Sequence, residues 1–204
     1  VGLYLGNPNV HNLGSLLLGS TFYRALRSQN LFTATSVDQL PHHVAARHLF
    51  GHYFLLPVPD LDRTQHLLIL GANPLVSNGS LMTTGGAKPR LQALRQRGGK
   101  MVVVDPRRTE TAVFADEHHF ITPGSDVLLL LAMVQTMFAE GLVNLGTLAP
   151  LVDGVAEVEA LTAPYAPQRV AAATGIAADT IRTMARELAA AASGVVYGRM
   201  GLST

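Results

Sequence analysis

Two uninterrupted apolar runs constrain the fold of this chain more than any other feature. They lie within HLLILGANP (residues 66–74) and KMVVVDP (residues 100–106), and a segment with helical spacing over residues 88–99 separates them. Strands without polar alternation are typical of parallel sheets, which helices cover on both faces. Parallel strands also need a long crossover connection, which the intervening helix supplies. The two runs therefore predict an α/β protein.

The rest of the chain continues this alternation of strands and helices. We expect further strands over residues 2–8, 31–36, 118–122 and 194–201, and further helices over residues 13–28, 40–53, 109–116, 125–141, 166–174 and 176–190. Thr109, Ser125 and the neighbourhood of Ala178 and Asp179 are the expected helix caps. Gly98-Gly99, Gly141 and Gly175 are the expected stops, and two prolines predict a linking loop over residues 55–63. The predicted fold is a mostly parallel, doubly wound (Rossmann-like) sheet with helices on both faces.

The composition indicates a piece of a larger protein. Hydrophobic residues make up 48% of the chain and charged residues only 14%, whereas an average soluble chain is about 25% charged. Much of the surface must then be apolar or covered, and we expect the chain to be truncated at both ends. The opening VGLYLGNPNV predicts a strand rather than a targeting signal. We expect a cytoplasmic location, with the periplasm as the open alternative.

Charge, hydropathy and cysteine content exclude several classes of function. The formal net charge is +1, so no basic field favours nucleic acid as a partner. The longest apolar run, VLLLLAMVQTMF over residues 127–138, is shorter than the ~20 residues of a membrane span. The chain has no cysteine, which excludes disulfides, Cys-ligated zinc and Cys-ligated iron–sulfur clusters within these residues.

Polar loops follow four of the predicted strands: LGANPLVSNGS, VDPRRTETA, ITPGSD and YGRMG. In an open parallel sheet such loops meet at one edge, where these proteins hold their ligands. Backbone amides at helix N-termini receive phosphate, and carboxylates such as Asp105 and Asp126 accept hydrogen bonds from a base or a ribose. The same residue types are also ordinary turn formers, so spacing alone leaves both interpretations open. The absence of a G-x-G-x-x-G motif and of a Walker A loop disfavours an ordinary NAD site or P-loop.

Four longer segments add a resemblance that spacing cannot give. In order along the chain, LLILGANPLVSNGS, VVVDPRRTETAVFADEHHFITPGSDVLLLLAMV, YAPQRVAAATGIAADTIRTMARELAAA and VVYGRMG resemble the molybdopterin oxidoreductases. This is the dimethyl-sulfoxide reductase superfamily, which includes formate dehydrogenases and nitrate reductases. The resemblance implies the central fragment of a multidomain enzyme. Residues 1–35 would end a preceding α/β domain, residues 36–62 would form a metal-site segment and linker, and residues 63–204 would form the dinucleotide-binding domain.

The resemblance also implies a cofactor, molybdenum (or tungsten) bis(molybdopterin guanine dinucleotide). Carried over residue by residue, Gly71, Asn73, Pro74 and Asn78 would contact the nucleotide and its diphosphate; Asp105 and Arg107 would lie by the guanine and ribose, with Pro123, Gly124 and Asp126 around them; and Gly198, Arg199, Met200 and Gly201 would line the pterin side. An iron–sulfur cluster is expected only in the missing N-terminal part. The expected partners are the missing N- and C-terminal domains of the same chain and electron-transfer subunits. Arg108 is expected to face solvent or pair with Glu110, and Glu117 to do likewise.

The resemblance places the protein ligand of the metal in the segment TATSVDQLPHHVAARHLFG, residues 33–51. The resemblance implies that Asp38 is the ligand, because DQLP resembles the aspartate-containing form of the family, and a carboxylate oxygen suits a hard oxidised molybdenum centre. Ser36 is the rival ligand, and capping of the following helix is the alternative role for Asp38. Gln39 and His42 would orient the carboxylate or relay a proton, and His43 is a second candidate for proton transfer.

The remaining histidines do not predict a zinc site. His48 and His52 have i, i+4 spacing, but no third ligand or H-E-x-x-H motif accompanies them. His118 and His119 lie in a predicted strand, where a structural role is expected.

Three classes of function therefore stand. The first is a two-electron redox or oxo-transfer enzyme, for example one that oxidises formate or reduces nitrate, whose central fragment is expected to be inactive alone. The second is a metal-free scaffold of the same fold in a respiratory complex, and the third is a generic nucleotide-binding module. The retained pterin-loop residues favour the first.

Overall fold

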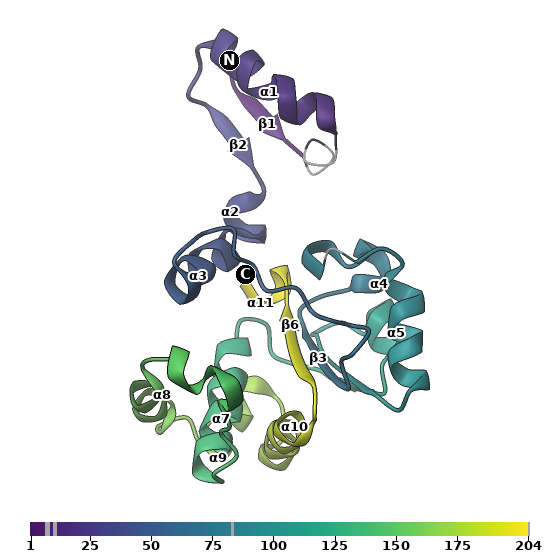
Figure 1. Cartoon of the computed structure of the whole chain (residues 1–204), viewed down its shortest axis with the longest axis vertical. Helices are drawn as coiled ribbons and strands as arrows, with labels where there is room; N and C mark the ends of the chain where they lie inside the picture. The colour runs from purple at the N-terminus through teal and green to yellow at the C-terminus, as the bar shows by residue number, and fades with distance from the viewer. Residues whose placement is uncertain (7–8, 10–11, 83, 204) are drawn as a thin grey trace. The chain divides into compact units, whose positions relative to one another are not determined.

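The chain forms two compact units. The computed structural model describes residues 1–6, 9, 12–82 and 84–203 (Figure 1). The first unit comprises Val1–Leu56 together with Ser203, and the second comprises Pro57–Leu202.

The first unit contains one β-α-β motif and two further helices. Strands β1 (Leu3–Leu5) and β2 (Leu31–Thr33) pair in parallel, and α1 (Leu13–Leu26) connects them. The Asn12 side chain caps α1 by accepting a hydrogen bond from the Ser15 amide at 2.9 Å. Helices α2 (Thr35–Asp38) and α3 (Leu40–Phe50) follow.

Both strands of the first unit are shorter than the sequence predicted. The strand expected over residues 2–8 covers only 3–5, and residues 7–8 lie outside the described part of the chain. The strand expected over residues 31–36 ends at Thr33. Its hydroxyl oxygen accepts a hydrogen bond from the Thr35 amide at 2.9 Å, which turns the chain into α2. Local hydrogen bonding of this kind competes with strand pairing.

The second unit is built on a four-stranded parallel sheet. Its strands are β3 (His66–Leu70), β4 (Lys100–Val104), β5 (Glu117–His119) and β6 (Gly194–Gly198), in the order β5-β4-β3-β6. All three pairings are parallel, which confirms the predicted sheet. The strand expected over residues 118–122 begins and ends earlier, because the Thr122 amide donates to the Thr174 carbonyl at 2.9 Å and leaves the sheet.

Helices cover both faces of this sheet (Figure 1). Because side chains alternate along a strand, Leu68 and Leu70 face one core and Leu67 and Ile69 face the other. The first core is closed by α7 (Asp126–Ala139), α9 (Pro167–Thr174) and α10 (Ala178–Ala190), and the second by α5 (Ala87–Gln96) and α6 (Glu110–Phe114). The doubly wound arrangement is thereby confirmed. The remaining elements are α4 (Pro74–Ser77), η2 (Ser80–Met82), η3 (Gly146–Leu151), α8 (Val155–Thr162) and α11 (Met200–Ser203).

The most apolar helix, α7, has 14 residues. Among the described residues, no helix combines the length and the apolar character needed to cross a bilayer.

The predicted cap positions are confirmed, since Thr109, Ser125 and Ala177, the neighbour of Ala178, occupy the N-cap positions of α6, α7 and α10, but of these three only Thr109 caps its helix with a side-chain hydrogen bond. The Thr109 hydroxyl accepts from the Ala112 amide at 3.1 Å and caps α6 as expected. Ser125 precedes α7, but its hydroxyl donates to the Thr122 carbonyl at 2.6 Å instead of capping the helix. Asp179 lies inside the first turn of α10 and pairs with Arg182 at 2.6 Å.

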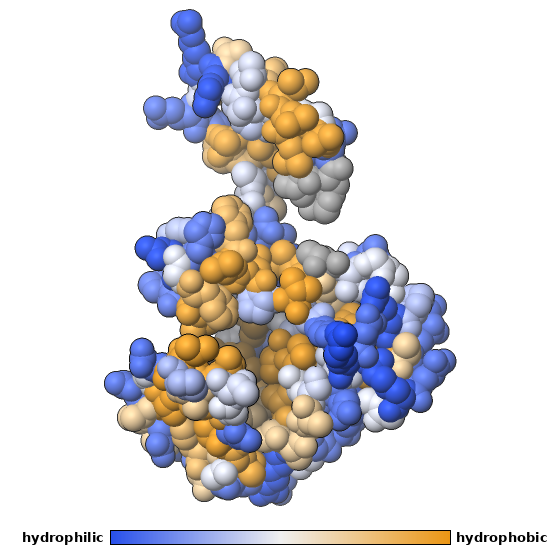
Figure 2. All heavy atoms as spheres, in the orientation of Figure 1, coloured by the Kyte–Doolittle hydropathy of each residue, from blue (hydrophilic) through white to orange (hydrophobic). Residues whose placement is uncertain are grey.

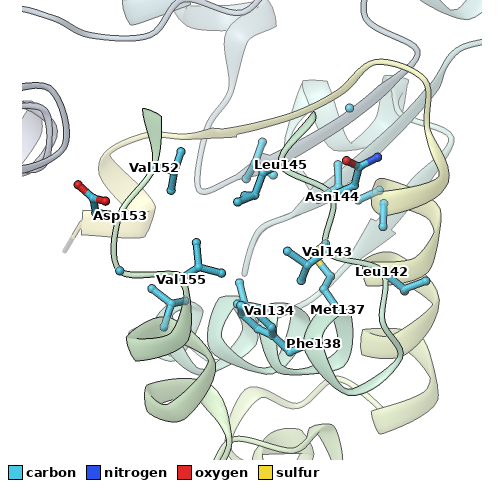
Figure 3. Close-up of a pocket in the computed structure, with 16 residues that line it drawn as sticks. Val134, Met137, Phe138, Leu142, Val143, Asn144, Leu145, Val152, Asp153 and Val155 are labelled. Carbon is cyan, nitrogen blue, oxygen red and sulfur yellow. The ribbon is translucent and has the colours of Figure 1, made fainter. Parts of the chain in front are cut away.

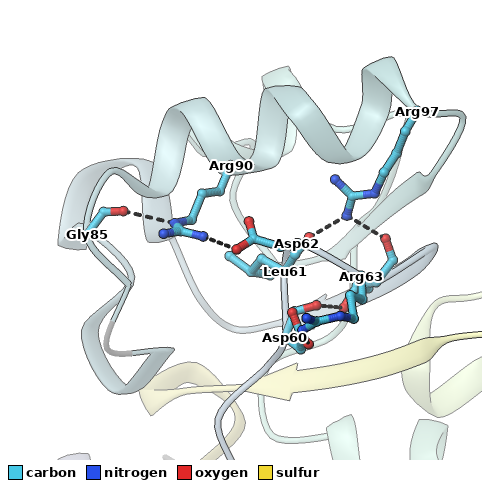
Figure 4. Close-up of polar contacts among 8 residues, drawn as sticks. Asp60, Leu61, Asp62, Arg63, Gly85, Arg90 and Arg97 are labelled. Atoms are coloured by element: carbon cyan, nitrogen blue, oxygen red, sulfur yellow. Dashed lines mark hydrogen bonds and ion pairs between the residues drawn. The ribbon is translucent and has the colours of Figure 1, made fainter.

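The segment before β3 is anchored to α5 rather than free (Figure 4). Arg90 forms an ion pair with Asp62. Arg97 donates to the Leu61 carbonyl and, at 2.8 Å, to the Thr64 carbonyl. The final part of the predicted linking loop therefore belongs to the second unit.

Candidate nucleotide and cofactor site

The loops that follow all four strands of the second unit are joined at the carboxyl edge of the sheet. The Gly71 amide donates to the Val104 carbonyl at 3.1 Å, which links the loops after β3 and β4. The Arg199 amide donates to the Leu70 carbonyl at 3.2 Å, which links the loop after β6 to β3. The Asp105 amide donates to the His119 carbonyl at 3.2 Å. The predicted gathering of these loops at one edge is therefore present in the structure.

Two glycines of this edge contact each other through their backbones. Gly71 has φ +55°, and a Cβ placed on it would lie 2.5 Å from the carbonyl carbon of Gly201. A Cβ on Gly201 would lie 2.7 Å from the Gly71 Cα, and the Gly201 amide donates to the Gly71 carbonyl at 3.1 Å. Only glycine allows so close an approach of two main chains. These two residues bring the predicted nucleotide loop and the predicted pterin loop together.

Two buried carboxylates form the polar centre of the edge. Asp105 is 8% exposed and Asp126 is 5% exposed. Burial raises the pKa of the Asp126 carboxyl above its usual range, and the charge of Asp105 raises this pKa further. One Asp105 oxygen accepts from the Arg107 amide at 2.8 Å. Within the described part of the chain, neither carboxylate has an Arg or Lys ion-pair partner within 4.0 Å.

These two carboxylates, which have no cationic partner in the described part of the chain, suit the base and the sugar of a guanine nucleotide. A carboxylate accepts hydrogen bonds through two oxygens, and guanine and ribose both present N–H or O–H donors. A ligand that donates to Asp126 would also offset the cost of keeping this charge away from water. The predicted roles of Asp105 and Asp126 are therefore chemically consistent with the structure.

The loop before α7 presents open space beside these carboxylates. Pro123 and Gly124 are exposed. Gly124 has φ +79°, and a Cβ placed on it would meet no atom within 4 Å. The backbone of this loop is therefore accessible to a ligand.

Asn73 has protein partners at both ends of its amide. Its oxygen accepts from the Thr111 hydroxyl at 2.7 Å and from the Thr111 amide at 3.3 Å. Its nitrogen donates to the Glu110 carboxylate at 2.8 Å, which holds the pKa of Glu110 below its usual range. The side chain therefore joins the loop after β3 to α6. Its predicted contact with the nucleotide stays a prediction.

The other predicted cofactor residues differ in exposure. Pro74 is buried at the start of α4, and Asn78 ends this helix in the left-handed conformation with φ 52°. Gly198 and Arg199 are half-buried, and Arg107 and Met200 are exposed. All of them lie in or next to the segments that follow β3, β4 and β6 at the carboxyl edge, with Gly198 as the last residue of β6.

Residues with no predicted cofactor role contribute to the same edge. His118 Nε2 lies 3.0 Å from the Asp105 carbonyl, to which a protonated ring nitrogen donates. The ring packs edge-on against Phe120 at a centroid distance of 4.5 Å. This placement agrees with the structural role expected of His118. Thr111 is fully buried, and the sequence pattern did not predict a role for it; the signal that could have indicated one is the T-E-T-A run at the start of α6.

Arg108 and Glu117 were expected to face solvent or to form ion pairs, and Arg108 is exposed as expected. Glu110 bonds to Asn73 rather than to Arg108. Glu117 pairs with Lys100 at 2.6 Å, and Lys100 also pairs with Glu187 at 2.6 Å. Glu117 therefore belongs to an ion-pair network that joins β4, β5 and α10.

The predicted metal-ligand segment lies at the junction of two helices in the first unit. Asp38 is the last residue of α2, Gln39 lies between α2 and α3, and His42 lies in the first turn of α3. Gln39 rather than Asp38 occupies the N-cap position of α3, so the capping alternative is wrong. The described residues hold no group of three or more His, Asp or Glu side chains placed to bind a metal. A centre with one protein ligand, as the resemblance implies, would not form such a group.

An apolar hollow in the second unit has a different chemistry from the carboxyl edge (Figure 3). It encloses about 500 Å³ and is lined by α7, α8, the end of α10, β6 and the segment over residues 142–145. Val134, Met137, Phe138 and Leu145 point into it. The hollow reaches Gly194 and Val196, the first half of β6, whereas the predicted cofactor residues follow the last half. Its aliphatic lining does not suit a charged dinucleotide.

Comparison with known proteins defines the class. Residues 6–190 match the family model for molybdopterin oxidoreductases. The chain belongs to this family.

The curated relatives include several oxidoreductases. Formate dehydrogenase H of Escherichia coli is 32% identical over 146 residues, which are 72% of this chain and 20% of that protein. The thiosulfate reductase molybdopterin-containing subunit of Salmonella typhimurium is 31% identical over 168 residues, which are 82% of this chain and 21% of that protein. The chain thus spans about a fifth of the length of the relatives it matches.

A solved structure shows the same fold. Acetylene hydratase from Pelobacter acetylenicus superposes with a TM-score of 0.72 and 24% sequence identity, over 88% of this chain and 24% of that chain.

Proposed function

We propose that this chain is the central part of a molybdenum or tungsten enzyme that depends on bis(molybdopterin guanine dinucleotide). The reaction would be a two-electron oxidation or reduction or an oxo transfer, such as formate oxidation or nitrate reduction. The observation that carries the proposal is the buried pair Asp105 and Asp126, without a cationic partner in the described structure. The family match and the two oxidoreductase relatives support the same proposal.

The residues of the carboxyl edge would bind and orient the nucleotide half of the cofactor. Asp105 and Asp126 accept hydrogen bonds from the guanine and the ribose, and the charge of Asp126 is stabilised when a donor arrives. The backbone around Gly71 and Gly124 admits the diphosphate, and Arg199 and Met200 lie on the pterin side. When bound, the metal–pterin group supplies the two-electron chemistry. The chain contributes binding and orientation.

Asp38 is the proposed protein ligand of the metal. Gln39 and His42, one and four residues further along, would orient its carboxylate or hold a proton near the substrate. In the full-length protein, Asp38→Ala should abolish turnover and leave the guanine content unchanged, because the nucleotide grip lies in other loops. Ser36→Ala is the matched control for the rival ligand. Full activity of Asp38→Ala would refute this assignment.

The test of the proposed function is analysis of the full-length protein that carries this chain. We expect molybdenum or tungsten together with a guanine-containing pterin. Asp105→Ala should lower the guanine content, because a charge-assisted hydrogen bond is worth roughly 1.5–3 kcal/mol. Asp179→Ala is the control, since the Asp179 side chain is 97% exposed. A wild-type protein with neither metal nor pterin would favour the metal-free scaffold, and unchanged guanine in Asp105→Ala would reject the role of Asp105.

The proposal also covers the partners of this chain and its location in the cell. The remaining domains of a longer polypeptide would close over the cofactor, and electron-transfer subunits would exchange electrons with it. The 204-residue chain alone should lack redox activity, because one domain cannot clamp a dinucleotide that two domains share. A cytoplasmic location stays a prediction.

A further inference from the structure

We infer that Asn73 is a positioning residue, which acts on the cofactor site through Thr111 and Glu110 rather than by touching the nucleotide with its side chain. The inference deepens the proposed function and rests on it for the identity of the ligand. The geometry that carries it is the clamp between the loop after β3 and the first turn of α6, which comprises Asn73, Leu75, Glu110 and Thr111.

The clamp is reciprocal. The Thr111 hydroxyl donates to the Asn73 side-chain oxygen at 2.7 Å and accepts from the Leu75 amide at 3.2 Å. The same Asn73 oxygen receives the Thr111 amide at 3.3 Å. Thr111 is fully buried, so loss of one partner would leave a polar group without water or protein to pair with, which is costly.

The second half of the clamp involves charge. The Asn73 nitrogen donates to Glu110 at 2.8 Å. An N–H bond to a carboxylate is charge-assisted and roughly twice as strong as a neutral one. The positive charge of Arg107 also lowers the pKa of Glu110. The clamp thus fixes the register between the loop that contains Gly71 and the loop that contains Asp105 and Arg107.

This arrangement explains why an asparagine stands at position 73. The residue must accept from Thr111 with one end and donate to Glu110 with the other. An amide does both, whereas an aspartate accepts at both ends and would place two carboxylates in contact.

An exchange of amide and carboxylate tests the inference. Asn73→Asp should disrupt the clamp by repulsion from Glu110. Glu110→Gln alone should change little, since the new amide still offers an acceptor oxygen. The double variant Asn73→Asp with Glu110→Gln should restore the clamp, because the glutamine then donates to the aspartate. Thr111→Val removes the hydroxyl and keeps the side-chain shape, and Thr111→Ser keeps the hydroxyl.

The first measurement is hydrogen exchange of the backbone amides over residues 71–75 and 105–112 in cofactor-free protein. We expect at least tenfold faster exchange in Asn73→Asp and in Thr111→Val, with wild-type rates in the double exchange variant and in Thr111→Ser. Unchanged exchange in both disruptive variants would overturn the inference whatever the ligand.

The second measurement is the affinity of the same cofactor-free proteins for guanosine diphosphate, at a temperature where every variant is folded. We expect Asn73→Asp and Thr111→Val to bind at least tenfold more weakly, and the double exchange variant to bind within threefold of wild type. Loss of binding in Asn73→Asp without rescue by Glu110→Gln, together with normal binding by Thr111→Val, would show a direct contact and overturn the inference. If wild-type protein binds no guanosine diphosphate while the exchange pattern holds, the nucleotide assignment fails and the positioning role stands.

Discussion

The two units of the molecule use the same β-α-β connection but differ in how much they bury. In the second unit every residue of β3 is buried, and helices cover both faces of the sheet. In the first unit, Ala46 is the one buried hydrophobic residue among those the structure describes. Helix α1 has no buried residue, and Figure 2 shows apolar side chains gathered over it. The exposed apolar residues of α1 include Leu13, Leu16, Leu17, Leu18 and Phe22.

The difference separates what local sequence determines from what packing determines. Caps, turns and helix propensity suffice to specify α1, since Asn12 caps its start. Parallel strands, in contrast, are found with both faces covered, and for the apolar patch on α1 we propose that another part of a longer polypeptide covers it, since exposed patches of this kind mark interaction surfaces. The low charge of the chain agrees with this, and so does its span of about a fifth of its relatives. We expect the two units to differ in stability for this reason.

The largest expected effect tests directly whether apolar side chains contribute more to stability in the second unit than in the first. Leu68 is 1% exposed between the sheet and its helices, so Leu68→Ala should destabilise the second unit by roughly 3–5 kcal/mol. The matched change on α1, Leu17→Ala at 66% exposure, should alter stability by less than about 0.5 kcal/mol. Denaturant unfolding of the 204-residue chain measures both. In the full-length protein the cost of Leu17→Ala should rise, and equal costs of the two changes in the short chain would contradict the comparison.

Two glycines with positive φ, one in each unit, test the comparison of the units further. At Gly71, a Cβ meets both the left-handed backbone and the Gly201 main chain, so Gly71→Ala should cost roughly 2–3 kcal/mol. At Gly51 of the first unit, φ is +81° but no atom lies within 4 Å of the new Cβ, so Gly51→Ala should cost only about 1 kcal/mol. Thermal unfolding checks the stabilities, and guanosine diphosphate binding should fall for Gly71→Ala alone. Similar losses at both positions would show that packing against Gly201 is unimportant.

The sequence predicted much of the second unit and less of the first. Uninterrupted apolar runs revealed β3 and β4, because residues buried on both faces need no alternation. Residues 34–36 were assigned to a strand wrongly, because the hydrogen bond between Thr33 and Thr35 is a local event that hydropathy does not report. Ser125 occupies the predicted N-cap position, but its side chain makes no capping bond for a similar reason, since its hydroxyl donates locally to the Thr122 carbonyl.

For the site, sequence order was enough to place the loops at one edge but not to assign each side chain. Turn residues after parallel strands located the loops around Gly71, Asp105 and Asp126. The partners of Asn73 could not be predicted, because Thr111 lies 38 positions further along the chain and meets it only through the fold. Such a pairing becomes visible only when the register of β3 and β4 is known.

The smallest expected effect concerns Asp126, whose burial gives it a raised pKa in the folded protein. A carboxyl with a folded pKa above its unfolded value binds its proton more tightly when folded. Its contribution to stability is therefore lost as the pH rises from the unfolded pKa through the folded pKa. Asp126→Asn should therefore stabilise cofactor-free protein at pH 7 by about 1 kcal/mol, the size expected when a poorly solvated charge is removed. The gain should disappear below the ordinary aspartate range, where wild-type Asp126 is protonated in both states.

Asp38→Asn, at a half-buried position of the first unit, is the control and should leave the stability of the second unit unchanged. Melting temperatures of the three proteins between roughly pH 2.5 and pH 8 provide the measurement, at a spacing of roughly 0.5 pH unit, because this range extends below the ordinary aspartate pKa of about 3.9. Destabilisation by Asp126→Asn at pH 7 would mean that the carboxylate is favourably paired without a ligand, and would remove the reason for assigning it to a nucleotide.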